Sequence, residues 1–562
     1  MSESNYWKLG DRSVSRRSVL RGTAVGGLGL AGAALIGCGS GGSNAPAGGS
    51  PAASGAAPGK SAAETPVVSE AYVQLQTRDA TTLDPTATTV YTVTQRVGLT
   101  YPRLLASVLQ DKNVQTSNKY VPSYIVDSWE AAGPQITFKL KKGVKYQNIA
   151  PLNGREFNAD DVKFSLDRYI KDPKSLFKSS YTDVTSVEAP DKYTIVLKLK
   201  APSRYMVNVL ASEQALILPP ETVADYKSKV IGPGPFIHES TTQGEGSRYK
   251  KNPDFINASG IYYNNFLFKV ITDAATRNAA MKTNQGDFID SGGLAPADLK
   301  TVEGPSVKTY PFVDISGQMI TWNSKNPKWK DYRTRLAMSK AFDRQLMIDQ
   351  TLQGAGKFPG PIPTDFGMYA LTDAEVKAHN VNKYDPAEAK KLWDAAGNPK
   401  DLPVEYYFSS NGTLDGVQSE LMAKQWTQNL GVKVTLKTEA YEIYLPKKNV
   451  GGYPDMFSNG YSVPLWIDHL FFAYLPGGGR NGSLFDVPEV TKALEDLRQT
   501  LDDKEAAEKS RKIQLLIWDK YLPVAQRPTG TLSGVYNSKL RNFNVGNHPV
   551  GTEWMLDSWK VK

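Results

Sequence analysis

The chain has 562 residues, a formal net charge of +9, 40% hydrophobic residues, one cysteine and four histidines. One cysteine excludes an intramolecular disulfide, and scattered histidines without an H-E-x-x-H motif or cysteine pair argue against a metal site. The length predicts two or three domains, and the interspersed charges are typical of a solvated surface rather than one that binds nucleic acid.

The first 38 residues have the pattern of an export signal. Adjacent Arg16 and Arg17 precede a short apolar run rich in Gly and Ala, which ends at Leu35-Ile36-Gly37-Cys38. The run is too short and too rich in Gly for a comfortable membrane-spanning helix, although a single-pass anchor is the alternative. The arginine pair resembles the twin-arginine signal for export of folded proteins. The final four residues resemble a bacterial lipobox, so we expect Cys38 to become the lipidated first residue.

Residues 39–67 form a tether rich in Gly, Ser, Ala and Pro. Such a segment has no apolar periodicity and cannot bury a core. No later apolar run is long enough to span a bilayer. We therefore expect one soluble body held near a membrane by lipid.

The folded body opens with a strand over 71–75 and helix-like spacing over 88–105. Alternation over 135–140 predicts a half-buried strand. Asn158 offers an N-cap with Asp161 three residues on, which predicts a capping box at the start of a helix. The apolar face of that helix would consist of Val162, Leu166 and Tyr169. The next alternating strand would contain Ile195, Leu197 and Leu199.

The C-terminal half predicts helices and a β-α-β unit. Asp385 as N-cap and Pro386 at the first position predict a helix that ends near Gly397. A strand over 404–408, a helix over 417–430 and a strand over 432–436 predict a parallel pair with a right-handed crossover. The helices of this half would bury Val417, Leu421 and Leu430, then Val490, Leu494, Leu497 and Leu501, then Ala506, Ser510, Ile513 and Ile517.

An ordered series of motifs resembles the family 5 extracytoplasmic solute-binding proteins, the oligopeptide- and dipeptide-binding components of ABC importers. The matching stretches are Ser128-Trp129-Glu130, Thr137-Phe138-Lys139-Leu140, Asn158-Ala159-Asp160-Asp161-Val162, Gly232-Pro233-Gly234-Pro235-Phe236, Asn252-Pro253-Asp254-Phe255, Gly286-Asp287-Phe288-Ile289-Asp290 and Ala341-Phe342-Asp343-Arg344. They span nearly everything after the tether.

The resemblance implies an α/β, two-lobed periplasmic-binding-protein-like fold of type II with an extra domain. Lobe I would combine 68–106, 234–320 and 533–562. The extra domain would be 107–233 and lobe II 321–532. Crossings near Ile320-Thr321 and Leu532-Ser533 would form the hinge, and closure of the lobes would enclose the ligand.

Motifs for catalysis are missing. There is no G-x-S-x-G, and Gly354-Ala355-Gly356-Lys357-Phe358 lacks the first glycine and the Ser/Thr of a P-loop. The paired carboxylates Asp160-Asp161 and Asp502-Asp503 stand at expected helix starts, where acidic residues favour the helix dipole. We therefore expect no enzyme activity and no cofactor.

The resemblance also implies candidate ligand-binding residues. Peptide-binding members carry a G-W-x-x-D loop whose aspartate pairs with the α-ammonium of the peptide. The loop here reads Gly460-Tyr461-Ser462-Val463-Pro464, so Pro464 stands at the aspartate position and Asp468 could substitute only if the loop is reshaped. Flat aromatic faces suit peptide side chains and sugar rings alike, and core packing is the alternative for each ring. For Tyr91 and Tyr441 we favour the pocket. The full candidate set is Tyr91, Tyr441, Asn459, Tyr461, Trp466 and Asp468.

These features predict a monomeric, lipid-anchored receptor on the extracytoplasmic face of the cell membrane. It would capture a peptide or an oligosaccharide and deliver it to ABC permease subunits, by binding and closure alone. A ligand sensor or chaperone on the same scaffold and a secreted hydrolase are the alternatives.

Overall fold

The computed structural model describes residues 65–561, apart from 78, 81, 88–90, 108–119, 213, 227–228, 291–293, 295, 313–315, 400, 411–412, 463–465 and 543–557. The export signal with Arg16, Arg17 and Cys38 and the tether before Thr65 therefore lie outside the described residues. No helix within the described ranges is both long and apolar enough to cross a membrane.

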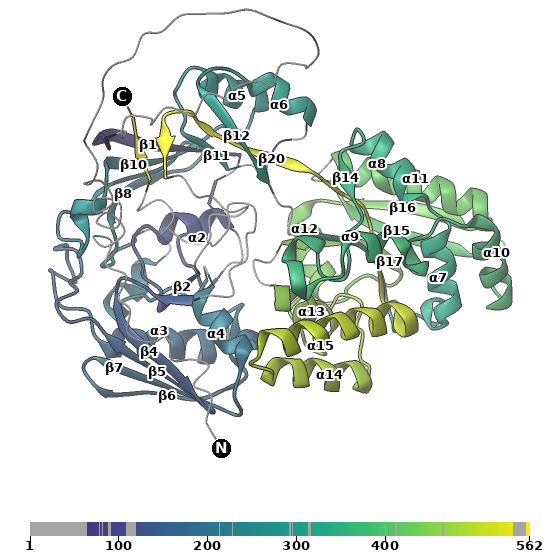
Figure 1. The fold of residues 1–562 in the computed structure, drawn as a ribbon, viewed down its shortest axis with the longest axis horizontal. Helices are drawn as coiled ribbons and strands as arrows, with labels where there is room; N and C mark the ends of the chain where they lie inside the picture. Colours follow the sequence, from purple (N-terminus) through teal and green to yellow (C-terminus); the bar gives the residue numbers. More distant parts are fainter. Residues whose placement is uncertain are drawn as a thin grey trace, which may run out of the picture. The chain divides into compact units, whose positions relative to one another are not determined.

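A seven-stranded sheet, here called the lobe I sheet, is assembled from distant parts of the chain (Figure 1). Its order is β12-β20-β11-β1-β10-β9-β8, and β1 runs parallel to both neighbours. The strands are β1 Ser69–Gln76, β8 Phe236–Thr242, β9 Gly246–Lys251, β10 Tyr263–Val270, β11 Phe288–Asp290, β12 Val307–Phe312 and β20 Leu532–Asn537. The helices near it are α2 Tyr91–Val97, α5 Ala274–Lys282 and α6 Pro296–Val302. Apolar side chains of α5, α6 and the sheet share one core.

The helix expected over 88–105 is shorter than predicted. It ends at Val97, before Gly98 and Pro102, and the chain then forms β2 Leu105–Ser107, which pairs with β3 Tyr120–Pro122. Glycine and proline each disfavour continuation of a helix, so the helical spacing of the apolar residues is overridden.

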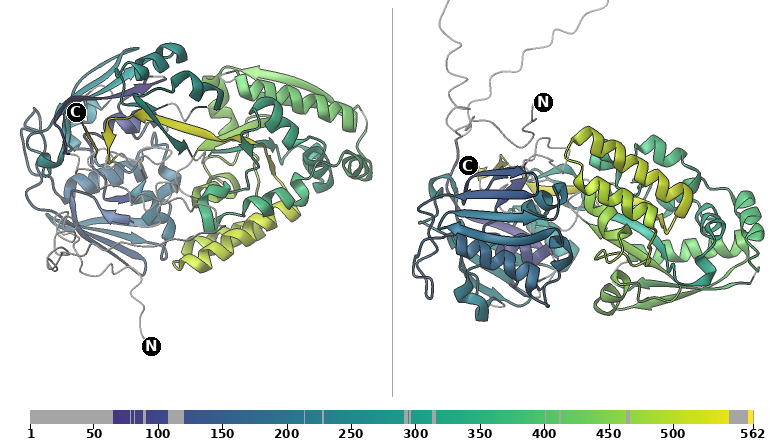
Figure 2. Two further views of the ribbon diagram at one scale, coloured as in Figure 1. Left: turned by 45° about the horizontal axis from the view of Figure 1, so that its top comes forward. Right: turned by 90° about the horizontal axis from the view of Figure 1, so that it is seen from below.

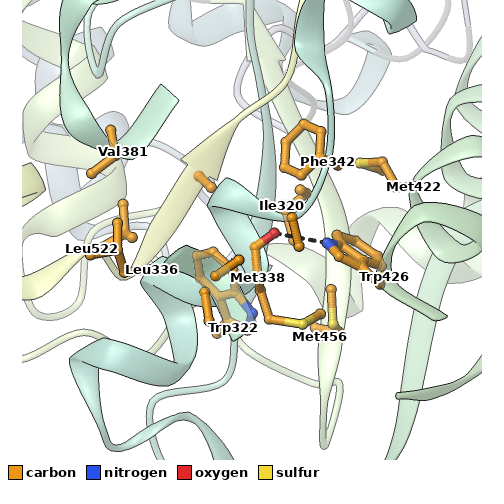
Figure 3. Close-up of a cluster of buried hydrophobic side chains, with 14 of the residues drawn as sticks. Ile320, Trp322, Leu336, Met338, Phe342, Val381, Met422, Trp426, Met456 and Leu522 are labelled. Carbon is orange, nitrogen blue, oxygen red and sulfur yellow. Dashed lines mark hydrogen bonds between the residues drawn. The ribbon is translucent and has the colours of Figure 1, made fainter. Parts of the chain in front are cut away.

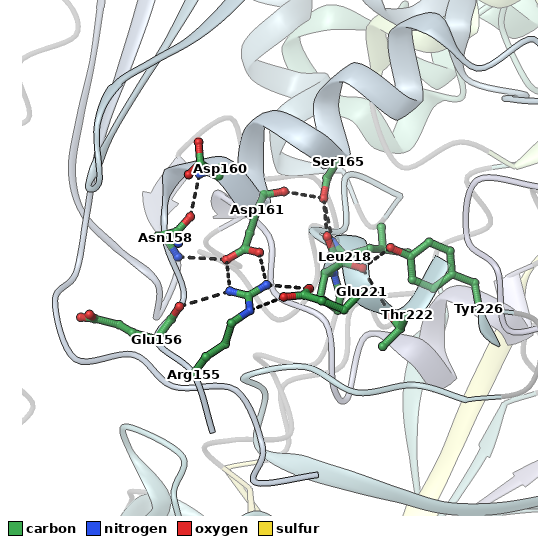
Figure 4. Close-up of polar contacts among 11 residues, drawn as sticks. Arg155, Glu156, Asn158, Asp160, Asp161, Ser165, Leu218, Glu221, Thr222 and Tyr226 are labelled. Atoms are coloured by element: carbon green, nitrogen blue, oxygen red, sulfur yellow. Dashed lines mark hydrogen bonds and ion pairs between the residues drawn. The ribbon is translucent and has the colours of Figure 1, made fainter. Parts of the chain in front are cut away.

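The range expected to form the extra domain, 107–233, contains a four-stranded antiparallel sheet, order β4-β5-β7-β6, and is called the extra domain below. Its elements are β4 Val126–Ala132, β5 Gln135–Leu140, α3 Ala159–Lys171, β6 Val184–Asp191, β7 Thr194–Leu199 and α4 Arg204–Ala211. The predicted capping box of α3 is confirmed, and Val162, Leu166 and Tyr169 are buried. Arg155 reinforces this helix start, because its guanidinium contacts both Asp161 and Glu221 (Figure 4).

A five-stranded sheet, here called the lobe II sheet, has the order β16-β15-β17-β13-β18. Its strands are β13 Ser316–Trp322, β15 Pro403–Ser409, β16 Lys433–Glu439, β17 Met456–Ser462 and β18 Val524–Gln526. The helices around it are α7 Tyr332–Lys340, α8 Arg344–Thr351, α9 Asp373–Ala378, α10 Pro386–Ala395, α11 Thr413–Leu430, α12 Tyr441–Asn449, α13 Trp466–Tyr474, α14 Pro488–Gln499 and α15 Asp503–Leu516. The predicted β-α-β unit is confirmed as β15-α11-β16, with a parallel pair.

The core of lobe II gathers large side chains from the sheet and from α7 and α11 (Figure 3). Trp426 of α11 is fully buried, and its indole N–H donates to the carbonyl of Met338 at 2.8 Å. The expected apolar face of α11 is partly wrong, because Val417 is 50% exposed. Leu430 is buried as expected, in one stripe with Met422 and Trp426, and Leu421 packs against the same core.

Short elements complete the chain. The two-stranded pairs are β14 Gly356–Lys357 with β19 Thr529–Gly530, and β21 Leu540–Arg541 with β22 Trp559–Lys560. The 3-10 turns are η1 Lys178–Tyr181, η2 Pro220–Asp225, η3 Ala258–Gly260, η4 Pro327–Trp329, η5 Thr364–Tyr369 and η6 Asn380–Asn382, and a π-helical turn, η7 Ile517–Tyr521, follows α15.

The chain passes between the two sheets at two points. The first lies between Phe312 and Ser316, because β13 pairs over its whole length with β17 of the lobe II sheet. The expected crossing near Ile320-Thr321 is therefore placed a few residues too late. The second crossing lies between Gly530, in β19, and Leu532, in β20. Figure 2 shows β20 leaving the lobe II region for the lobe I sheet.

Candidate functional site

The C-terminal end of β17 lies beside the first crossing, because Ser462 pairs with Ser316 and Gly460 with Gln318. On its other side β17 pairs with β15 only at Met456 and Phe457. Beyond Phe457 none of the described strands pairs with that edge, and side chains of α12 contact it instead. The hydroxyl of Tyr444 donates to the carbonyl of Ser458, and the ammonium of Lys448, one turn later, donates to the carbonyl of Gly460 at 2.6 Å.

A buried arginine occupies the same end of the strand. Arg527, just after β18, pairs with Asp415 at 2.7 Å and donates to Ser458 Oγ at 3.0 Å and Gln318 Oε1 at 3.2 Å. Its Nε is buried with no hydrogen-bond partner among the described residues. Lys448, itself 8% exposed, has no carboxylate within ion-pair distance in the described part of the chain.

Burial also sets the charge state of two groups. It lowers the pKa of Lys448 to about 7, assisted by the positive charges of Arg480 and Arg527 and opposed by Asp415. It raises the pKa of Asp468 to about 7, opposed by Arg480. Arg480 thus lies within electrostatic range of both an acid and a base.

Asp468 lies on α13, which follows β17 in the chain. Its side chain is buried, and its Oδ1 has no hydrogen-bond partner among the described residues. Burial raises the pKa of Tyr120 and of Tyr205, both in the extra-domain region, and the charge of Asp468 adds to each shift. Asp468 therefore lies within electrostatic range of Tyr120 and Tyr205.

The extra domain touches lobe II directly at this place. Tyr205 of α4 meets Phe471 of α13 edge to face, with ring centroids 5.2 Å apart. Arg498 of α14 pairs with Asp183 at 2.8 Å. Arg204 of α4 reaches the segment between α14 and α15, where Thr500 accepts its Nε hydrogen bond. Figure 1 shows α4 beside the ends of α14 and α15.

The predicted site residues with described side chains differ in their burial and contacts. Asn459 is buried on β17, and its amide oxygen accepts from the backbone N–H of Gly460 at 2.9 Å. Trp466 is buried with its ring stacked on Tyr369, centroids 4.1 Å apart. Tyr441 is half-buried at the start of α12.

Two further predicted residues have a described backbone only. Tyr91 begins α2 and Tyr461 lies in β17, but their side chains, and residues 463–465 with Pro464, are outside the described set. Ligand contacts of all six candidates stay a prediction. The sequence analysis missed Lys448 and Arg527, because a Lys447-Lys448 pair and a lone arginine are normally surface features and no pattern marks them as buried.

The described residues hold no group of three or more His, Cys, Asp or Glu side chains able to bind a metal ion. The polar groups at the end of β17 and on α13 are of the kinds that recognise charged groups by ion pairs and hydrogen bonds.

The fold and this arrangement define an α/β binding protein of the periplasmic type, in which two sheets are joined by crossing segments. Residues 119–483 match the model of bacterial extracellular solute-binding proteins, family 5 Middle. The chain belongs to this family, and it is therefore a binding protein and not an enzyme, as expected.

Relatives and solved structures agree with this assignment. Di/tripeptide-binding protein 1 of Pseudomonas aeruginosa is 24% identical over 462 residues, covering 75% of this chain and 83% of the relative. The periplasmic binding protein DppA of Helicobacter pylori, solved with the peptide STSA, superposes with a TM-score of 0.74 at 20% identity, covering 88% of this chain and 98% of that one. AgaA from A. tumefacien R10, solved with agropinic acid, gives a TM-score of 0.73 at 21% identity, covering 88% and 99%.

Proposed function

We propose that the protein captures a peptide-like solute between its two lobes and delivers it to the permease of an ABC transporter. Family membership supports solute capture, and the names of the relatives favour peptides. The observation that carries the proposal is the buried carboxylate of Asp468. A buried carboxyl oxygen without a hydrogen-bond partner is costly, and a ligand that supplies a donor or the opposite charge would remove that cost.

In this proposal Asp468 accepts the ammonium group of the ligand, in place of the loop aspartate whose position Pro464 occupies. The remaining ligand surface is lined by Tyr91, Tyr441, Asn459, Tyr461 and Trp466. Movement of lobe I and the extra domain relative to lobe II, about the crossings at 312–316 and 530–532, encloses the ligand.

An oligosaccharide is the second candidate ligand, favoured by the proline at the position of the loop aspartate. Native mass spectrometry of the full-length chain, purified gently, reads out a retained ligand. Retained peptides, or a melting temperature that rises with di- and tripeptides, support the first proposal. A retained sugar, or a rise with oligosaccharides only, contradicts it.

Asp468→Asn tests the role of the carboxylate, since it keeps the shape and removes the charge. We expect it to weaken binding of a peptide with a free α-amine about 10- to 100-fold, the value of a charged hydrogen bond. Asp486→Asn, an exposed position beyond α13, is the matched control. Equal affinity of the two variants would refute the assignment of Asp468.

The proposal includes the lipid anchor. After export directed by Arg16 and Arg17, cleavage before Cys38 leaves a lipidated cysteine that holds the protein on the outer face of the cell membrane. Cys38→Ala should release the protein into the soluble fraction. A mature N-terminus other than Cys38 would contradict this part of the proposal alone.

A further inference from the structure

Helix α13 carries the proposed ammonium partner, Asp468, between two residues whose contacts lead to the extra domain. Trp466 opens the helix just before Asp468, and Phe471 follows Asp468 at the third position after it. Residues with this spacing are neighbours on one helix face, so Asp468 and Phe471 share a face of α13. The Asp468 carboxyl group is buried, and its Oδ1 has no hydrogen-bond partner among the described residues. The contacts that hold Trp466 and Phe471 therefore also set where this carboxyl group lies.

The extra domain holds the Phe471 end of α13 through aromatic rings and one arginine. Tyr205 of α4 meets Phe471 edge to face, with ring centroids 5.2 Å apart. The Cζ atom of Arg498 lies 5.1 Å from the ring centroid of Tyr205 and 5.0 Å from that of Phe471. Arg498 also pairs at 2.8 Å with Asp183, which accepts at 2.7 Å from Oγ of Ser203, the N-cap of α4. These contacts fix α4 against α13.

The first turn of α13 is held through a second route. The Trp466 ring stacks on Tyr369, with centroids 4.1 Å apart and ring planes 6° from parallel. Tyr369 donates its O–H to Asp503 Oδ1 at 2.8 Å, and Asp503 pairs with Arg204 of α4 at 2.8 Å. The two routes thus end on adjacent residues of one extra-domain helix, Arg204 and Tyr205.

We propose that Tyr205 is a positioning residue through which the extra domain sets the place of the Asp468 carboxyl group, and so the preference for ligands that carry an ammonium group. This inference rests on the proposed function and gives the extra domain a part in it. A charged hydrogen bond weakens steeply as its distance and angle depart from the optimum. Loss of this support therefore reduces recognition of the ammonium more than binding of the rest of the ligand. A domain that served only to close the molecule would affect ligands with and without the amine alike.

Matched ligands separate positioning from closure. The probes are di- and tripeptides with a free α-amine and their des-amino analogues, in which hydrogen replaces the amine, measured by isothermal titration calorimetry on the full-length chain. Wild type should bind each amine about 10- to 100-fold more tightly than its analogue. Failure of every probe to bind overturns the proposed function and this inference with it. Equal binding of both kinds of ligand overturns the assignment of Asp468 and its positioning, and leaves peptide capture standing.

The variant Tyr205→Leu removes the ring that meets Phe471. It should reduce the preference for the amine about 2- to 30-fold. Tyr205→Phe keeps the ring and should restore the wild-type preference. Tyr193→Leu is the control and should keep the full preference, because Tyr193 lies in the same domain, between β6 and β7, where its ring meets the ammonium groups of Lys142 and Lys192.

Equal weakening of both kinds of ligand by Tyr205→Leu, or an unchanged preference, overturns the proposal. If that variant does not fold, Tyr369→Phe decides instead, since it keeps the stack on Trp466 and removes the O–H bond to Asp503. It should lower the preference for the amine by at least about twofold. An unchanged preference in Tyr369→Phe would then overturn the proposal.

Discussion

Arg204 of α4 donates from Nε to the backbone carbonyl oxygen of Thr500, at the end of α14, over 2.7 Å. The same guanidinium donates to the carbonyl of Leu501 and pairs with Asp503 at 2.8 Å. It therefore satisfies carbonyls that the end of a helix leaves without partners. One buried side chain of the extra domain thus holds the junction of two lobe II helices.

Replacing Arg204 by Met should favour separation of the extra domain from lobe II. The substitution keeps apolar bulk but leaves the carbonyls of Thr500 and Leu501 unsatisfied, at a cost of about 1–3 kcal/mol. Small-angle X-ray scattering should show a larger radius of gyration, and peptide affinity should fall. Arg333→Met is the control, because Arg333 pairs with Asp331 at the surface. Scattering identical to wild type would contradict a fastening role for Arg204.

The start of α3 should be sensitive to one carboxylate. Asp161 accepts from Arg155 at 2.6 and 3.0 Å and from the backbone N–H of Asn158 at 3.0 Å. We expect Asp161→Asn to lower the free energy of unfolding by about 2 kcal/mol in urea titrations, because charge-assisted bonds are lost in a buried setting. Asp160→Asn, exposed in the same turn, should change it by less than about 0.5 kcal/mol. Similar effects at both positions would rule out the ion pair as the cause.

Asp468 should make the free energy of unfolding fall as the pH rises, which is the reverse of the usual effect of a carboxylate. Its pKa in the folded protein is about 7, above its ordinary value of 3.8. Between these values the folded state holds a proton that the unfolded state has released, so stability falls as pH rises from about 4 to 7. Asp468→Asn should remove this part of the slope in urea titrations at several pH values. A slope unchanged by the substitution would show that Asp468 is ionised normally in the fold.

The core of lobe II offers a matched pair on one helix. Trp426→Ala should lower the free energy of unfolding by about 3–5 kcal/mol, because it opens a cavity and leaves the Met338 carbonyl without its donor. Val417→Ala, half-exposed on the same helix, should change it by less than about 0.5 kcal/mol. Equal melting temperatures for the two variants would disprove this ranking.

The features of the fold that could be predicted are those set by residues close together in the sequence. Asn158 with Asp161 and Asp385 with Pro386 are cap residues whose side chains act within one turn, and both helix starts are confirmed. Val417 was assigned to the core because periodicity gives a stripe but not its exact rotation toward the sheet. The crossing near Phe312 was misplaced because no composition change marks where a strand changes sheet.

The charged part of the candidate site lay beyond such reasoning. The sequence offers Asp468 only as a substitute for the loop aspartate that Pro464 replaces, and this says nothing of the burial of Asp468. Lys448 and Arg527 are 79 residues apart in the sequence, and they share one strand end only after the lobe II sheet has formed. Whether a charged side chain lies near an opposite charge depends on three-dimensional packing, so no sequence pattern reveals it.

The position of β20 has a consequence for synthesis of the chain. Edge strand β12 pairs only with β20 within the lobe I sheet, and β20 also borders β11. Residues 307–312 therefore cannot join the sheet until 532–537 have been synthesised, more than two hundred residues later. The lobe II sheet uses only the intervening stretch, 316–526. A nascent chain can thus complete its lobe II sheet first, and a chain released before residue 532 would lack the strand that joins β12 to β11.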